Sequence, residues 1–190
     1  MNRKYRKTIV AGNWKMHKTA TETKLFAERL KGALPRVKRC SIVLCVPYVD
    51  IPAAVKILKD SRVAVGAQNL HWETSGPTRG KSPPHAGDLD VKYVIIGHSE
   101  RRALFGETDL TINKKLHAAL DAGLRPILCV GEDLEQREAG VTLEFISYQP
   151  ESALAGVTRK RCAGWSSPMS PSGPSAPATP PPRSRPVRSV

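Results

Sequence analysis

The sequence predicts an α/β fold built on a parallel sheet. Short apolar runs, such as 41–46 (SIVLCV) and 93–97 (YVIIG), alternate along the chain with segments of helical periodicity. These runs are apolar on both faces, as is typical of parallel strands covered by helices. The pattern fits an open doubly wound sheet or a (β/α)₈ barrel. No GxGxxG or P-loop motif follows a strand, which weighs against the nucleotide-binding doubly wound folds.

The first half of the chain holds three expected strands and two expected helices. Helical spacing of Leu25, Phe26 and Leu30 favours the first helix, and Pro52 fits the first turn of the second. In order, the elements are a strand at Thr8–Gly12, a helix at Thr19–Leu34, a strand at Ser41–Val46, a helix at Ile51–Lys59 and a strand at Val63–Ala67.

The second half continues the alternation. We expect a strand at Tyr93–Gly97, a helix at Asp109–Ala122, a strand at Pro126–Val130 and a weaker helix at Thr142–Ala155, because Pro150 would break or kink it. This spacing gives about five βα units, whereas a complete barrel typically needs about 250 residues. Residues 1–156 are therefore predicted to form a partial barrel. Residues 157–190, rich in proline and serine, are predicted to form a disordered basic tail.

The net charge of +13 is concentrated at the two ends of the 190-residue chain. Such a tail attracts nucleic acid or anionic membranes through its field, but it has no aromatic residue after Trp165 on which bases would stack. A solvated tail is the simpler interpretation. The four cysteines show no CxxC pairing. No secretory or membrane-spanning segment is evident, so we expect free thiols and a cytoplasmic location.

Polar residues with catalytic potential follow two of the expected strands. Asn13 and Lys15 come after the first strand, and His98, Ser99 and Glu100 come after the fourth. Barrel enzymes build their active sites at these strand ends. Either group alone is weak evidence, because surface lysines and structural histidines are common.

Taken together, five segments are far more specific: AGNWKM, AQNLHWE, YVIIGHSERR, FGETD and PILCVGE occur in this order, each near the end of an expected element. This series resembles triose-phosphate isomerase over about residues 6–140. The resemblance implies a TIM (β/α)₈ barrel, a homodimer, and the interconversion of glyceraldehyde 3-phosphate and dihydroxyacetone phosphate in glycolysis and gluconeogenesis. It implies no cofactor and no metal.

The resemblance also implies roles for particular residues. Asn13 and Lys15 match substrate-binding positions, and the Lys15 ammonium would stabilise the phosphate and the enediolate oxygen. His98 matches the histidine that polarises the substrate carbonyl, and Ser99 and Glu100 match positions that order the site. Triosephosphate isomerase is itself a standard example of a histidine kept neutral at a helix N-terminus.

Three segments depart from the family pattern. His17 replaces an asparagine. The run at Pro77–Gly87 differs throughout, in the loop that the family uses to dock its partner subunit. The run at Trp165–Ala176 stands where the family has the motif that contains its catalytic glutamate. One set of codons that encodes this run would translate as VVIAYEPVWAIG, which resembles that motif, in another reading frame. The His17 change has no functional explanation, whereas the two altered runs suggest frameshifts and predict the loss of the general base, poor stability and a weakened dimer.

Three functions follow from these observations. An active isomerase would depend on Asn13, Lys15 and His98. A catalytically dead isomerase-like fragment would fold poorly and show no turnover. A nucleic-acid binder would depend on residues 157–190 and would bind less tightly at high salt. The family resemblance favours the first two.

Overall fold

A computed structural model describes residues 8–34, 40–77, 81–158, 161 and 170–171. The basic segment 1–7, Cys162, the run from Trp165 and most of the expected tail lie outside these residues, apart from 170–171. The strands are β1 (Ile9–Asn13), β2 (Ser41–Val46), β3 (Val63–Ala67), β4 (Tyr93–Ile96), β5 (Arg125–Val130) and β6 (Ser170–Pro171).

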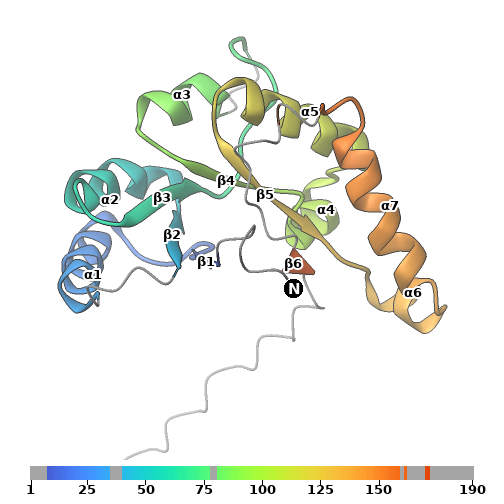
Figure 1. Cartoon of the computed structure of the whole chain (residues 1–190), viewed down its shortest axis with the longest axis horizontal. Coiled ribbons are helices and arrows are strands. Elements are labelled where there is room, and N and C mark those ends of the chain that lie inside the picture. Colours follow the sequence, from blue (N-terminus) through green and yellow to red (C-terminus); the bar gives the residue numbers. More distant parts are fainter. Residues whose placement is uncertain (1–7, 35–39, 78–80, 159–160, 162–169, 172–190) are drawn as a thin grey trace, which may run out of the picture.

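The strands form one parallel sheet in the order β1-β2-β3-β4-β5-β6. A doubly wound sheet reverses its strand order at a switch point, whereas a barrel adds each new strand on the same side. The sequential order therefore decides between the two folds left open by the sequence. Figure 1 shows the sheet as an open, curled arc with helices around its outer side. The predicted partial barrel is confirmed.

The two faces of the sheet carry different clusters of apolar side chains. Along β2, Leu44 and Val46 pack into the main core, while Val43 and Cys45 belong to a second cluster. Strand β4 alternates in the same way, so the two-residue period of a strand accounts for both clusters. Cys45 is a free thiol, and its burial raises its pKa to about 12. This thiol is therefore a packing group.

Helices connect successive strands and cover the main core. They are α1 (Ala20–Ala33), η1 (Tyr48–Asp50), α2 (Ile51–Leu58), α3 (Pro83–Asp88), α4 (Ser99–Phe105), α5 (Asp109–Asp121), α6 (Leu134–Glu138) and α7 (Thr142–Leu154). Thr19 and Glu22 form a capping box at the start of α1, and Thr108 caps α5 in the same way. None of the described helices is both long and apolar enough to span a membrane.

Several elements differ from the sequence-based expectation: η1 and α6 were not expected, and α3, α7 and β6 differ as follows. Helix α3 lies in the altered run, where prolines and a glycine gave no helical signal, although Pro83 suits a first helical turn. Helix α7 continues through Pro150, so the proline does not end it. Strand β6 lies within the region expected to hold no ordered element, beside the otherwise free edge of β5.

A buried glutamine on α7 fastens this helix to the end of β5. The Gln149 side chain accepts a hydrogen bond from the Gly131 backbone N–H at 2.8 Å and donates one to the Gly131 carbonyl at 3.1 Å. Gln149 is only 1% exposed, so water does not replace these bonds. The clamp holds the last helix in register with the strand that precedes it.

We expect Gln149→Leu, which keeps the side-chain volume, to lower the free energy of unfolding by about 1–3 kcal/mol, because both polar groups of Gly131 lose a buried partner. Urea denaturation followed by circular dichroism measures this change. The neighbouring Tyr148→Leu is the control, since Tyr148 is 56% exposed. Equal unfolding midpoints for Gln149→Leu and the parent chain would contradict the clamp.

Candidate active site

The loop after β1 holds Lys15 in a constrained turn. Asn13 is the last residue of β1, and its side-chain oxygen accepts a hydrogen bond from the Lys15 backbone N–H at 3.1 Å. Lys15 has a φ of 52°, in the left-handed region that residues other than glycine seldom adopt. Gln68 stabilises this turn, because its Nε2 donates to the carbonyls of Lys15 at 2.9 Å and Cys45 at 3.0 Å.

Gln68 was not among the predicted site residues. It lies directly after β3, in the AQNLHWE segment that contributed to the family resemblance, and that position was the available signal. Gln68 follows β3, Cys45 belongs to β2 and Lys15 follows β1. The Gln68 side-chain amide therefore connects the ends of three strands. The orientation of the Lys15 backbone therefore depends on all three.

His98 occupies the cap position of α4. Gly97 precedes it with a φ of 74°, and a side chain there would come within 3.2 Å of the Cys129 carbonyl, so glycine is required. The His98 Nδ1 accepts a hydrogen bond from the Glu100 backbone N–H at 3.3 Å. Since Nδ1 acts as an acceptor, Nε2 carries the proton of the neutral ring.

An ion pair connects the two loops. The Lys15 Nζ donates to Glu100 Oε1 at 2.6 Å, and the second carboxylate oxygen lies 3.6 Å from His98 Nδ1. The hydrogen bond from Lys15 holds the pKa of Glu100 below its usual range. Burial lowers the pKa of His98; the Glu100 charge opposes this shift, and the Lys15 charge adds to it. His98 is therefore neutral at pH 7.

A single pocket of about 600 Å³ brings most of the predicted residues together. Asn13, Lys15, His98 and Glu100 all line it, whereas Ser99, the first residue of α4, does not. The other lining residues were not predicted as site residues; they are Met16, His17, Pro47, Tyr48, Gln68, Asn69, Lys81, Arg101, Leu104 and Phe105.

Buried charges support the loop that carries His98. Arg101 and Lys115 both donate to the carboxylate of Glu107, and Lys115 also donates to Asn69 at 2.8 Å. Burial raises the pKa of Glu107, but the hydrogen bonds from Lys115 and Arg101 outweigh it and keep the carboxyl ionised. This network joins α4 and α5 to the segment after β3, so both sides of the pocket share one support.

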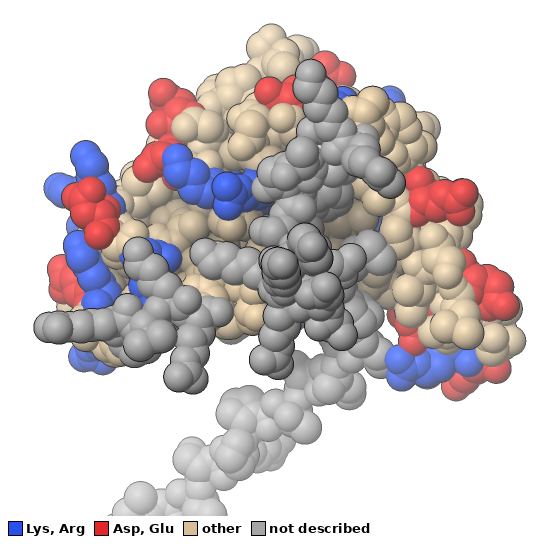
Figure 2. Space-filling view, in the orientation of Figure 1, with Lys and Arg blue, Asp and Glu red and all other residues tan. Residues whose placement is uncertain are grey.

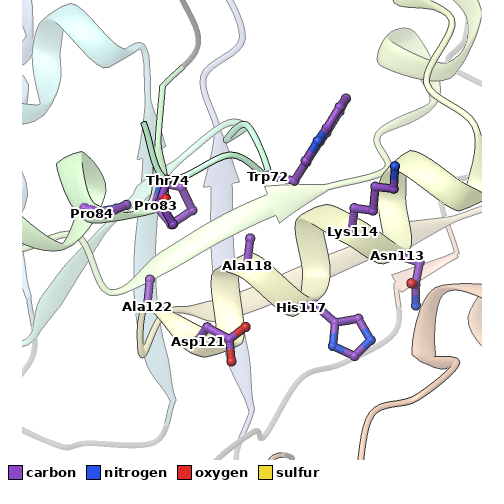
Figure 3. A pocket seen from close by; sticks show the side chains of 10 residues that line it. All are labelled: Trp72, Thr74, Pro83, Pro84, Asn113, Lys114, His117, Ala118, Asp121 and Ala122. Atoms are coloured by element: carbon purple, nitrogen blue, oxygen red, sulfur yellow. The ribbon is translucent and has the colours of Figure 1, made fainter. Parts of the chain in front are cut away.

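A second hollow, of about 470 Å³, lies between Trp72 and α5. Figure 3 shows Lys114, His117 and Asp121 along α5, which forms one side of it. It contains none of the predicted site residues.

Basic and acidic side chains lie close together at the left and lower right edges of the face in Figure 2.

The pocket offers hydrogen-bond donors suited to a polarised carbonyl or an anion. An ammonium such as that of Lys15 and an imidazole N–H such as the Nε2–H of His98 are the kinds of donor that stabilise negative charge on an oxygen. Among the described residues that line the pocket, Glu100 alone carries a carboxylate, and its hydrogen bond to Lys15 occupies it. In the described part of the chain, no group of three or more His, Cys, Asp or Glu residues is placed to hold a metal ion.

The electrostatics of His98 are testable by NMR. We expect its imidazole to titrate below the ordinary value of 6.5 and to carry its proton on Nε2 above that pH. In Glu100→Gln the pKa should fall further, because the carboxylate that favours the imidazolium is removed. Long-range ¹H–¹⁵N spectra measure both quantities. A higher pKa in Glu100→Gln, or a proton on Nδ1, would contradict this geometry.

Comparisons with known proteins identify the family of this chain. The family model described as triosephosphate isomerase matches residues 8–165. The chain is 51% identical over 157 residues to the triosephosphate isomerase of Acetivibrio thermocellus, covering 82% of this chain and 62% of that protein. It is 50% identical over 159 residues to that of Synechococcus sp. (strain JA-3-3Ab), covering 80% and 62%.

A solved structure gives the same result. The crystal structure of triosephosphate isomerase from Bartonella henselae superposes with a TM-score of 0.73 at 33% identity, covering 80% of this chain and 63% of that one. The chain thus spans a little over three fifths of the length of each of these relatives. By sequence and by fold, it belongs to the triosephosphate isomerase family.

Proposed function

We propose that this chain binds triose phosphates and carries the electrophilic half of an aldose–ketose isomerase site. One observation carries the proposal: the Lys15 ammonium and a neutral His98 with its proton on Nε2 line the same pocket. Asn13 orders the turn that presents Lys15, and Glu100 orients the ammonium by its ion pair. Ser99 contributes the first turn of α4 rather than a contact in the pocket.

The isomerisation requires a proton to leave one carbon and return to its neighbour. As the proton leaves, the carbonyl oxygen gains the negative charge of an enediolate. The His98 Nε2–H and the Lys15 ammonium donate hydrogen bonds to this oxygen, and a preorganised donor of this kind typically contributes about 10²–10³-fold in rate. The reaction needs no cofactor, because it is redox-neutral: a base takes the proton from one carbon and the neighbouring carbon is reprotonated, while the electron pair never leaves the substrate.

A general base is the missing part of this site. The sequence contains no Asp or Glu after residue 151. We propose that the glutamate is encoded in another reading frame across Trp165–Ala176, where the alternative frame reads VVIAYEPVWAIG. The match to the family model ends at Trp165, the first residue of this run, which supports the idea. The coding nucleotides of this segment test it directly.

Without a positioned base, turnover should fall by about 10²–10⁴-fold. The chain would then act as a binding-competent, catalytically dead isomerase-like protein of cytoplasmic glycolysis and gluconeogenesis. The altered run at 77–87, which contains all but the last residue of α3, argues against the dimer contact that the family makes through this loop. No feature of the described residues favours nucleic-acid binding over this function.

Binding tests the proposal independently of turnover. We expect dihydroxyacetone phosphate to bind the parent chain in a calorimetric titration, and Lys15→Met to weaken that binding by about 10- to 100-fold, because a charge-assisted hydrogen bond is lost. Lys92→Met is the matched control, since Lys92 pairs with Asp90 and does not line the pocket.

The proposal would be wrong if the Lys15 and Lys92 variants bound the phosphate ester equally well, or if the parent chain did not bind it. Thermal unfolding of each variant establishes that the comparison is made between folded proteins.

A further inference from the structure

A hydrogen-bonded joint outside the candidate site holds the end of α7 against α5. Two side chains one turn apart on α5 build it. Asn113 Nδ2 donates to the carbonyls of Ala153 and Ala155, each at 2.9 Å. The His117 Nε2 lies 2.9 Å from the same Ala155 carbonyl. These bonds satisfy carbonyls at the C-terminal end of α7, which have no partner within their own helix.

The other ring nitrogen of His117 binds an arginine from beyond the end of α7. The Arg161 Nη1 lies 2.9 Å from His117 Nδ1. Its Nη2 donates to the His117 backbone carbonyl at 3.4 Å and to the carboxylate of Asp121, one turn further along α5. Three groups of α5 therefore hold Arg161, and one of them is an imidazole nitrogen.

These two partners decide where the proton of the ring lies. A guanidinium has no acceptor, so Nδ1 must accept the hydrogen bond from Arg161. A carbonyl has no hydrogen to donate, so Nε2 must donate to Ala155. The His117 ring is therefore the neutral tautomer with its proton on Nε2. A second proton would have to sit on Nδ1, where the Arg161 N–H now points, so the proton and the arginine exclude each other.

The charges around His117 strengthen this exclusion. An imidazolium would face the Arg161 guanidinium across 2.9 Å, and two like charges repel at that distance. The Asp121 carboxylate already pairs with Arg161. Lys114 lies over the Trp72 ring, 5.6 Å from its centroid, and Figure 3 shows it leaving the opposite side of α5 from His117.

The bond from His117 to α7 responds to a proton in the opposite way. The C-terminal end of a helix carries a partial negative charge, which favours an imidazolium that donates to it. The bond from Nε2 to the Ala155 carbonyl therefore survives protonation, whereas the bond from Arg161 does not. The residues that line the hollow from the side opposite α5 carry no charge; they are Trp72, Thr74, Pro83 and Pro84.

We propose that His117 is a pH-sensitive latch for Arg161. The neutral ring holds Arg161 on α5, and a proton on Nδ1 releases it while the bond from Nε2 keeps α7 in place. Histidine is the side chain whose charge ordinarily changes between pH 5 and 8, so the latch is closed at the upper end of this range and open at the lower end. The inference is independent of the proposed function, because neither residue lines the candidate site.

NMR of the arginine side chains in the full chain measures the state of the latch. A guanidinium that is held by hydrogen bonds rotates slowly about its Cζ–Nη bonds, so its Nη groups give separate signals, which Arg161→Lys assigns. We expect the ratio of bound to free Arg161 to fall by about 5- to 10-fold between pH 8 and pH 5.5, the effect of losing one hydrogen bond.

Three variants make the test specific. His117→Gln keeps an acceptor and a donor but takes up no proton, so Arg161 should stay bound at both pH values. His117→Leu lacks the acceptor and should release Arg161 already at pH 8. The matched control is His85→Gln, because His85 is exposed on α3 and does not line the hollow. This control should keep the pH response of the parent chain.

Retention of Arg161 at pH 5.5 in His117→Gln, together with its release in the parent chain, supports the latch. The latch is wrong if the parent chain gives the same Arg161 signals at both pH values, if His117→Gln loses them as the parent does, or if His85→Gln abolishes the response. Circular dichroism at each pH establishes that the chain is folded. If the parent chain unfolds at pH 5.5, His117→Leu at pH 8 decides, and bound Arg161 in that variant overturns the proposal.

Discussion

The ion pair between Lys15 and Glu100 is the contact on which the candidate site depends. It joins two loops that lie 85 residues apart in the sequence, one after β1 and one at the start of α4. A parallel sheet with sequential strand order brings these loops to the same edge, because all its strands end there. The carboxylate holds the ammonium beside His98, and the backbone N–H of the same residue fixes the tautomer of the imidazole. One glutamate therefore sets the charge and the geometry of both donors.

Much of this arrangement was predictable from the sequence. The strands at 41–46 and 63–67 were placed at the residues the structure gives, because uninterrupted apolar runs between turn residues have few alternatives. Asn13, Lys15 and His98 were predicted as site residues because they lie at the ends of such strands and match motifs of the family. Gln68 was missed, since a side chain that bonds a distant carbonyl has no local signal. Helix α3 was missed because its sequence, PPHAGD, contains two prolines and a glycine.

The departures from the family affect the two halves of the chemistry differently. The two donors, Lys15 and His98, lie at the ends of described strands and helices. The ion pairs that Arg101 and Lys115 form with Glu107 stabilise the loop that carries His98. The family's general base is a glutamate. No Asp or Glu follows residue 151 in this sequence, and the family's motif for that glutamate is also lost there. Under the proposed function, the described residues supply the donors for an anion and a carbonyl, whereas no carboxylate follows Glu151 to take the place of the family's base. Binding and turnover should therefore be separable in this chain.

Deuterium exchange into dihydroxyacetone phosphate in D₂O tests this separation most directly, because exchange requires the carbon-bound proton to leave but does not require a complete turnover. We expect the proton resonances of the ligand to broaden when the chain is added, because the ligand binds, while deuterium enters the carbon no faster than in free solution. Exchange that exceeds the free-solution rate and disappears in His98→Ala would contradict it, and would mean that a base in this chain completes the site.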